Sequence, residues 1–230
     1  MSSFRKKAIK QKGNTDVYIC MKRYLLWLLL PLACAGSLKE NPKNNMSQEI
    51  QTTNLDSIVL GGGCFWCLDA VYRNMEGIEK IECGYSNGLV KKPTYREVCT
   101  GRTQCVEVVK LYFDSQKTTL EEILTVFWRI HDPTTLNRQG NDIGTQYRSG
   151  IYFVNSDQES IAMKSRDAAS EAGLWDDPIV TEIQALKDYS TAEDYHQNYY
   201  EGNKEQPYCV FVVGEKVEKF KKLFKDKLKD

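Results

Sequence analysis

The sequence contains only two histidines, His131 and His196, and it carries no net charge, because 31 Lys and Arg balance 31 Asp and Glu. Without a global field, nothing attracts nucleic acid or acidic lipid. The eight cysteines include no second pair that would complete a zinc site with Cys64 and Cys67. A chain of 230 residues with 41% apolar content is also large enough to fold without a disulfide scaffold. These absences favour redox chemistry as the use of the cysteines.

The most informative stretch is residues 57–67, Ser-Ile-Val-Leu-Gly-Gly-Gly-Cys-Phe-Trp-Cys. Its β-branched run predicts a strand, and the glycines lead to Cys64, where the next helix should begin. A thiol in that position faces unpaired backbone N–H groups, which lower its pKa. Phe65 and Trp66 are large apolar residues at the mouth of a turn and indicate a pocket. The stretch therefore predicts a cysteine enzyme.

Three other interpretations of Cys64-x-x-Cys67 stay open at this level. The pair could be half of a zinc site, a thioredoxin-like redox pair, or a strand-to-helix turn with two small buried hydrophobes. A zinc site would need two further ligands at similar spacing, whereas Cys83, Cys99 and Cys105 occur singly. We therefore favour a reactive thiol.

The N-terminal part differs in composition from the rest. Lys22 and Arg23 precede an apolar run, residues 24–35, which is too short to span a bilayer and ends in small residues, as in a secretory signal peptide. The run also resembles a bacterial lipoprotein signal with Cys34 as the lipidated residue. We expect export to the periplasm or cell envelope, with a lipid anchor at Cys34 as its one membrane contact. We expect three parts: an N-terminal extension with the signal peptide over residues 1–36, a polar linker over residues 37–56, and one folded domain over residues 57–230.

From residue 57 onward, strands and helices alternate. The predicted strands are residues 57–60, 78–85, 106–113, 151–154 and 179–186. The predicted helices are residues 66–75, 95–100, a helix that Thr118 or Thr119 caps and Pro133 ends, 157–172, and a last amphipathic helix over 217–228. Alternation of this kind favours one α/β layer fold.

Three further stretches carry polar residues that a plain core does not need. Glu107 stands in an apolar strand between Val106 and Val108, and a half-buried carboxyl there would have a raised pKa and hold a proton at neutral pH. An ordinary outward-facing strand glutamate explains the pattern equally well. Residues 131–148 form a long polar segment, and such loops are usually functional. Residues 192–197 could equally be the solvated start of a helix.

Several motifs occur in a fixed order along the chain. They are Gly63-Cys64-Phe65-Trp66, Pro93-Thr94-Tyr95-Arg96-Glu97-Val98-Cys99, Glu107, residues 138–149 (RQGNDIGTQYRS) and residues 192–197 (AEDYHQ). Together they resemble peptide methionine sulfoxide reductase A, from Val59 to about Cys209. The resemblance implies an α/β (α+β) fold, a two-layer sandwich with a ferredoxin-like core in which helices flank a mixed sheet.

The resemblance also implies a chemistry, the reduction of the S epimer of methionine sulfoxide, free or in proteins, as repair of oxidised proteins. Cys64 would attack the sulfoxide sulfur and become a sulfenic acid, while Glu107 would protonate the oxygen. Tyr95 and Tyr147 would donate hydrogen bonds to that oxygen. Asp142 would organise the polar side of the site, and Phe65 and Trp66 would hold the methyl group. The family needs no metal or bound organic cofactor, and a thioredoxin-type donor restores the thiols.

The chain departs from the family pattern in two places. Gln104-Cys105-Val106 stands where many members have Gly-His-Ala, which puts the fine tuning of Glu107 in doubt. Cys67 stands where many members have glycine, as in a subset that carries Cys-Phe-Trp-Cys.

Two cysteines compete to resolve the sulfenic acid on Cys64. Cys67 lies in the same helical turn, at high effective concentration. Cys209 matches the family's usual C-terminal resolving position, but residues 210–213, Val-Phe-Val-Val, predict an ordered segment instead of a mobile tail. We therefore expect the Cys64–Cys67 disulfide to form first, with Cys209 relaying oxidation to the surface.

A second functional class stays open beside this one. An exported thiol-disulfide exchanger or a redox-regulated binding protein would use Cys64 and Cys67 without touching sulfoxides. Such a protein has no use for Glu107, Tyr95 and Tyr147 around one pocket. Turnover of a methionine sulfoxide peptide, compared with reduction of a generic disulfide, separates the two.

Overall fold

The computed structural model describes residues 54–229. The predicted signal peptide, Cys34 and nearly all of the linker lie outside the described residues. None of the helices within 54–229 has the length and apolar character needed to cross a membrane.

Six strands form one mixed sheet in the order β7-β6-β1-β3-β2-β8. Their bounds are β1 (Leu55–Gly61), β2 (Ile78–Ser86), β3 (Val106–Asp114), β6 (Gly150–Phe153), β7 (Glu182–Ala185) and β8 (Ser190–Thr191). Neighbouring strands are antiparallel except β6 and β7. A small separate hairpin is formed by β4 (Arg138–Gln139) and β5 (Asp142–Ile143).

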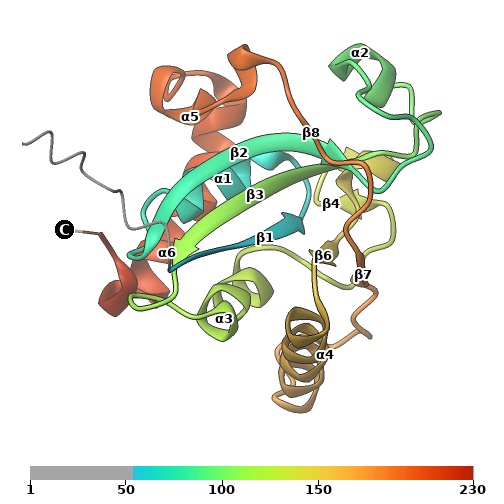
Figure 1. The fold of residues 1–230 in the computed structure, drawn as a ribbon. Coiled ribbons are helices and arrows are strands. Elements are labelled where there is room, and N and C mark those ends of the chain that lie inside the picture. The colour runs from blue at the N-terminus through green and yellow to red at the C-terminus, as the bar shows by residue number, and fades with distance from the viewer. Residues whose placement is uncertain (1–53, 230) are drawn as a thin grey trace, which may run out of the picture. The chain divides into compact units, whose positions relative to one another are not determined.

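The helices are α1 (Phe65–Tyr72), α2 (Tyr95–Val98), α3 (Leu120–Ile130), α4 (Ser156–Glu171), α5 (Tyr199–Gly202) and α6 (Gly214–Leu223). Short 3₁₀ turns are η1 (Thr145–Tyr147), η2 (Asp194–His196) and η4 (Lys225–Lys227), and η3 (Cys209–Val213) is a π-helix. Figure 1 shows β2, β3 and β1 side by side, with α1 and α6 behind them.

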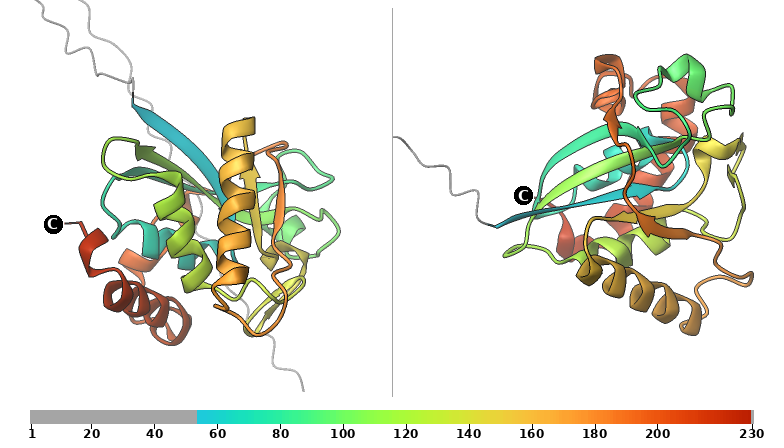
Figure 2. Two further views of the ribbon diagram at one scale, coloured as in Figure 1. Left: turned by 90° about the horizontal axis from the view of Figure 1, so that it is seen from below. Right: turned by 45° about the vertical axis from the view of Figure 1, so that its right-hand side comes forward.

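Two βαβ halves build the centre of the fold. β1-α1-β2 and β3-α3-β6 interleave so that the four strands lie in the order β6-β1-β3-β2, which is the split βαβ arrangement of a ferredoxin-like core. This confirms the predicted fold class. α3 and α4 lie side by side (Figure 2), and the indole N–H of Trp128 donates to Ser165 Oγ (2.8 Å) between them.

The main core lies between the sheet and the helices. β1 contributes Ile58 and Leu60 to it, and β3 contributes Val109 and Leu111. The other sheet face carries a small second cluster of Val59, Val106, Val108 and Tyr152, which Leu186 and Tyr189 cover. Because β3 is buried on both faces near its start, its sequence shows no clear alternation there.

Most element boundaries agree with the sequence to within a few residues. Thr119 caps α3 through a capping box with Glu122. The predicted strand over 179–186 is shorter, since only 182–185 pair with β6. The last helix begins earlier than expected, at Gly214, because the π-helix η3 runs directly into it.

Candidate active site

The turn between β1 and α1 places Cys64 at the N-cap of α1. Gly63 has a φ of 86°, and a Cβ atom there would lie 2.5 Å from Gln139 Cγ, so this position requires glycine. Cys64 is 7% exposed. Cys67 is buried, and its N–H donates to the Cys64 carbonyl oxygen (3.1 Å). The turn therefore holds both thiols at the start of one helix.

Glu107 lies on β3, on the sheet face that the helices cover, and is 1% exposed. Its Oε2 accepts a hydrogen bond from the Phe65 N–H (3.2 Å), at the start of α1 beside Cys64. Burial raises the pKa of Glu107 to about 8, and the negative charges on Asp142 and Cys67 contribute to this rise. The hydrogen bond from the Phe65 N–H lowers the pKa but does not cancel this effect. Glu107 is therefore neutral at pH 7, and the outward-facing alternative is wrong.

The two thiols of the turn have pKa values shifted in opposite directions. A hydrogen bond from Cys64 to the Cys67 thiolate lowers the pKa of Cys67 to about 7, against burial. Burial raises the pKa of Cys64 well above its ordinary value. The hydrogen bond to Cys67 raises it further, because Cys64 is the donor and must keep its proton. This corrects our expectation of a lowered pKa at Cys64, because the Phe65 N–H points to Glu107 instead of the sulfur. The pair as a unit therefore loses a proton near neutral pH, and its two sulfurs share one negative charge.

The structure brings Tyr95 and Tyr147 to the same carboxyl. Both side chains are half-buried. Burial is the main cause that raises the pKa of each tyrosine, and the charge on Glu107 is the second, so the hydroxyls remain protonated donors. Glu193 fixes Tyr95, since its carboxylate accepts the Tyr95 N–H (2.9 Å) and the Tyr85 hydroxyl (2.9 Å). Glu193 therefore links the segment of Tyr95 to β2, which carries Tyr85.

Aromatic rings form the wall next to the thiols. Trp66 stacks on Tyr199 with ring centroids 3.8 Å apart, and the His196 ring lies 4.9 Å from that of Phe65 and 4.5 Å from that of Tyr95. Both His196 nitrogens and Trp66 Nε1 are buried and have no hydrogen-bond partner among the described residues. We assigned no role to His196 or Tyr199 from the sequence, and the AEDYHQ motif was the one signal that could have found His196.

Asp142 reaches the site through Tyr208. The Tyr208 hydroxyl donates to Asp142 Oδ2 (2.6 Å). Its ring packs edge-on against Trp66, with centroids 6.1 Å apart. Sequence reasoning did not identify Tyr208 as a site residue, although it directly precedes Cys209.

Cys209 is buried at the start of the π-helix η3. Burial, and then the charge on Cys67, raises its pKa above the ordinary thiol value. The ordered segment predicted from residues 210–213 is confirmed. The C-terminal segment therefore places a third thiol within the electrostatic reach of Cys67.

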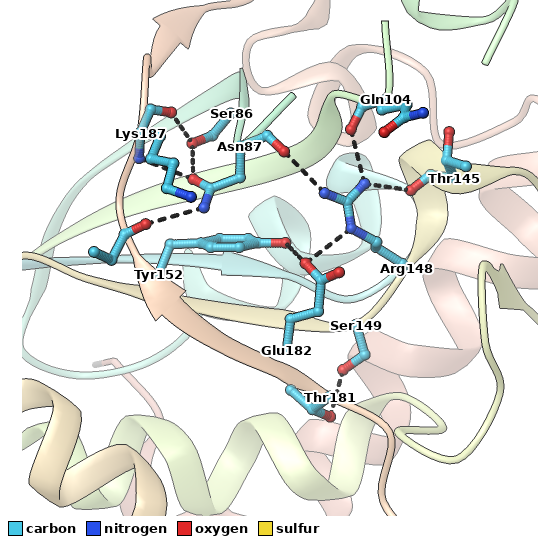
Figure 3. Close-up of polar contacts among 11 residues, drawn as sticks. Ser86, Asn87, Gln104, Thr145, Arg148, Ser149, Tyr152, Thr181, Glu182 and Lys187 are labelled. Atoms are coloured by element: carbon cyan, nitrogen blue, oxygen red, sulfur yellow. Dashed lines mark hydrogen bonds and ion pairs between the residues drawn. The ribbon is translucent and has the colours of Figure 1, made fainter. Parts of the chain in front are cut away.

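Arg148 was also not identified as important from the sequence. Its guanidinium donates to the carbonyl oxygens of Asn87 (3.0 Å), Gln104 (2.9 Å) and Thr145 (2.9 Å), and to Glu182 Oε2 (2.9 Å). Figure 3 shows this side chain between all four acceptors. One cation thus ties the end of β2, the segment before β3 and the η1 turn to the edge strand β7.

This cluster explains how the chain tolerates Gln104 in place of the family's glycine. Gln104 has a φ of 52°, a left-handed conformation that glycine adopts at lower cost. Arg148 holds its carbonyl. The next residue, Cys105, is buried and donates its S–H to the Val90 carbonyl oxygen (3.4 Å).

A neutral buried carboxylic acid, a thiol pair that shares one negative charge and two tyrosine hydroxyls meet where β1 ends. These groups define a thiol-dependent oxidoreductase site that can attack an electrophilic sulfur and protonate its leaving oxygen. Within residues 54–229, no group of three or more His, Cys, Asp or Glu side chains is placed to hold a metal ion.

Comparisons with known proteins identify the family. A family model described as peptide methionine sulfoxide reductase matches residues 56–228. The peptide methionine sulfoxide reductase MsrA of Trichodesmium erythraeum is 49% identical over 174 residues, covering 76% of this chain and 98% of that protein. Its counterpart in Leptospira borgpetersenii is 49% identical over 168 residues, covering 73% and 94%. Reduced Mxr1 from Saccharomyces cerevisiae superposes with a TM-score of 0.65 at 34% identity, covering 69% of this chain and 91% of that chain.

The chain therefore belongs to the peptide methionine sulfoxide reductase family. It is an oxidoreductase that reduces methionine sulfoxide.

Proposed function

We propose that the chain reduces the S epimer of methionine sulfoxide, free and within proteins, through a sulfenic acid and an intramolecular disulfide, and so repairs oxidised proteins. The observation that carries this proposal is the buried Glu107 carboxyl, which accepts the Phe65 N–H at the start of α1, next to Cys64. Burial raises the pKa of this carboxyl to about 8. Sulfoxide oxygen leaves a sulfur only when it is protonated, and a neutral carboxylic acid supplies that proton at pH 7.

In the first step the Cys67 thiolate takes the proton of Cys64 as the Cys64 sulfur attacks the sulfoxide sulfur. Glu107 gives its proton to the sulfoxide oxygen, to which Tyr95 and Tyr147 donate hydrogen bonds. The S–O bond breaks, and its hydroxyl bonds to the Cys64 sulfur. The bond that Cys64 formed to the methionine sulfur breaks with both electrons on methionine, which leaves as the thioether and leaves a sulfenic acid on Cys64. Phe65 and Trp66 hold the methyl group, and Asp142 with Tyr208 organises the polar side.

The sulfenic acid is then resolved by the neighbouring thiol. The Cys67 sulfur attacks the Cys64 sulfur, the hydroxyl leaves with the Cys67 proton as water, and the Cys64–Cys67 disulfide forms. Cys209 attacks Cys67 next, which frees Cys64 and moves the disulfide to Cys67–Cys209. A thioredoxin-type dithiol reduces that disulfide by exchange, and no metal or bound organic cofactor takes part.

One stoichiometric turnover without reductant, followed by disulfide mapping, tests the order of these steps. The wild-type protein should yield Cys64–Cys67 first, Cys209→Ser should still yield it, and Cys67→Ser should accumulate sulfenic acid on Cys64. If Cys67→Ser cycles at the wild-type rate while Cys209→Ser stalls, the order is wrong.

Substrate assays test the activity itself. The S epimer of a methionine sulfoxide peptide should be turned over, while the R epimer should not. A generic disulfide such as that of oxidised insulin should be a poor substrate. The opposite result, disulfide reduction without sulfoxide turnover, would support the thiol-disulfide exchanger.

We also propose that the protein is exported, on the basis of the basic and apolar segments before residue 36. Intact-mass measurement of the protein from the cell envelope should show loss of that segment, and a lipid mass on Cys34 if it is anchored. An unprocessed chain beginning at Met1 or Met21 would contradict export.

A further inference from the structure

A cavity of about 650 Å³ lies beside the active site, between the segment that includes residues 130–142 and the C-terminal helices η3 and α6. Two of its lining residues, Asp142 and Tyr208, belong to the site already described. The proposed reaction assigns no use to the rest of the cavity.

Two independent contacts show that the cavity and the thiols share a wall. Gln139 lines the cavity, and its side chain packs directly on Gly63, the residue before Cys64. Tyr208 lines it too, and the Tyr208 ring packs edge-on against Trp66, which directly precedes Cys67, with centroids 6.1 Å apart. The cavity therefore adjoins the turn that carries Cys64, although Cys64 itself does not line it.

The walls of the cavity differ in charge. On the 130–142 side, Asp132 is already engaged, since its Oδ1 accepts the Thr134 N–H (2.9 Å) and hydroxyl (2.6 Å). Asp142 accepts the Tyr208 hydroxyl (2.6 Å). Glu215 lies in the first turn of α6, on the opposite side of the cavity from Asp132.

The α6 side carries the two cations of the lining, Lys216 and Lys219. Within residues 54–229, neither makes an ion pair. Burial lowers the pKa of His131, in the opposite wall, to about 3, and the charges on Lys216 and Lys219 contribute to that shift. The electrostatic effect of both lysines therefore reaches across the cavity. Partial burial, Lys216 and Arg129 lower the pKa of Lys219 itself. Among the described residues, the side chains of Lys216 and Lys219 therefore stay unpaired on this wall, which also carries the carboxylate of Glu215.

Apolar surface lies next to these cations. Phe211 is 67% exposed at the cavity, and Trp175 faces it with its indole N–H held by the Trp128 carbonyl oxygen (3.1 Å). An exposed aromatic side chain beside unpaired lysines suits a peptide segment that is partly apolar and carries a carboxylate.

We propose that this cavity binds the peptide chain that flanks the methionine sulfoxide, and that Lys216 and Lys219 select substrates with an acidic residue close to it. The inference rests on the proposed function, since it assigns a substrate class to the same site. It predicts that acidic, unfolded or surface segments are repaired faster than basic ones.

Three seven-residue peptides test the selection, each with a central S-methionine sulfoxide flanked on both sides by Glu, Gln or Lys. We expect kcat/KM of the wild-type chain, with dithiothreitol as reductant, to be about 3- to 10-fold higher for the Glu peptide than for the Lys peptide at low salt. Lys219→Glu should remove or invert that ratio. Lys222→Glu makes the same charge change on α6 outside the cavity lining and is the matched control.

Free methionine sulfoxide separates this proposal from the reaction itself. Its turnover should be equal in the wild type, Lys219→Glu and Lys222→Glu. Equal kcat/KM for all three peptides in the wild type, or an equal effect of the two substitutions, would overturn the selection by this wall. Absence of turnover with every peptide and with free methionine sulfoxide would instead contradict the proposed function.

Discussion

The Arg148 cluster and the thiol site adjoin each other where β1 ends, since a Cβ atom on Gly61 would lie 3.3 Å from the Arg148 carbonyl oxygen. In the cluster, all three guanidinium nitrogens donate hydrogen bonds, to four acceptors. At the thiol site, by contrast, the buried polar atoms of Trp66 and His196 have no partner among the described residues. Glu107 is buried, and no cation within residues 54–229 forms an ion pair with it.

This difference separates the part of the molecule that holds the structure from the part that reacts. A saturated cluster has one low-energy arrangement, so it is rigid. A site whose buried carboxyl and thiols have shifted pKa values is instead suited to proton transfer and nucleophilic attack. The predictions below alter one region or the other.

Cys64→Ser should have the largest effect and abolish reductase turnover. A hydroxyl forms no nucleophilic anion at neutral pH, so both attack on sulfur and formation of the sulfenic acid are lost. Peptide turnover measured by chromatography checks the loss, and a denaturant midpoint close to the wild-type value shows that the fold is kept. Substantial residual turnover would remove Cys64 from the mechanism.

Arg148→Met should act on stability and lower the free energy of unfolding by about 3–5 kcal/mol, because it leaves Glu182 and three carbonyl groups without their donor. Denaturant unfolding measures the change. Arg166→Met is the matched control, since Arg166 pairs with an exposed Asp167 and its loss should cost about 0.5 kcal/mol or less. Equal costs would show that the cluster is not a special anchor.

Glu107→Gln should lower turnover by roughly 10²-fold, about 2.7 kcal/mol in activation free energy, through loss of the acid. Wild-type activity should rise with pH as the thiol pair ionises near pH 7 and fall as Glu107 loses its proton near pH 8. The variant should lose the alkaline decline. A pH–rate profile with the same decline in both proteins would assign it to another group.

The same substitution should change stability in the opposite direction. The folded-state pKa of Glu107 is raised above its ordinary value of 4.5 to about 8, so folding favours its protonated form. Its contribution is fully present below about pH 4.5 and is lost as the pH rises through 8. Unfolding at pH 9 should therefore show Glu107→Gln to be more stable than the wild type. A variant that is less stable at that pH would contradict the burial of a neutral acid.

Gln104→Gly should have the smallest effect, a gain in unfolding free energy of about 0.5–1 kcal/mol from relief of the left-handed backbone. Gln104 is exposed and Arg148 binds its carbonyl oxygen, which glycine keeps. Thermal unfolding of Gln104→Gly and Gln104→Ala separates backbone relief from loss of the side chain. If Gln104→Ala is stabilised as much as Gln104→Gly, the gain comes from loss of the glutamine side chain and not from relief of the backbone.

Sequence patterns identified the elements and the chemistry because both are local in this chain. The Gly63-Cys64 turn requires glycine for its backbone, and the N-cap follows directly from the strand before it. The helical spacing in α3 and the Thr119 cap are likewise properties of neighbouring residues. For this reason the α/β layer fold and the position of Cys64 followed from local patterns, whereas the ferredoxin-like core was implied by the family resemblance.

The surroundings of each reactive group depended on the tertiary structure. Whether Glu107 faces the helices or solvent could not be inferred, because β3 is buried on both faces near its start. The relative pKa values of Cys64 and Cys67 followed from burial and from where the Phe65 N–H points. These are long-range effects, set by residues distant in sequence.

The same distinction explains why Arg148, His196 and Tyr208 were missed as individual residues. Arg148 binds segments 44 and 61 residues away, and Tyr208 binds Asp142 across 66 residues. By itself the sequence determined the local turn that presents the thiols and the order of strands and helices. The tertiary structure alone decided which charges and rings meet around them, because pKa and hydrogen bonding depend on distance in space and not on distance along the chain.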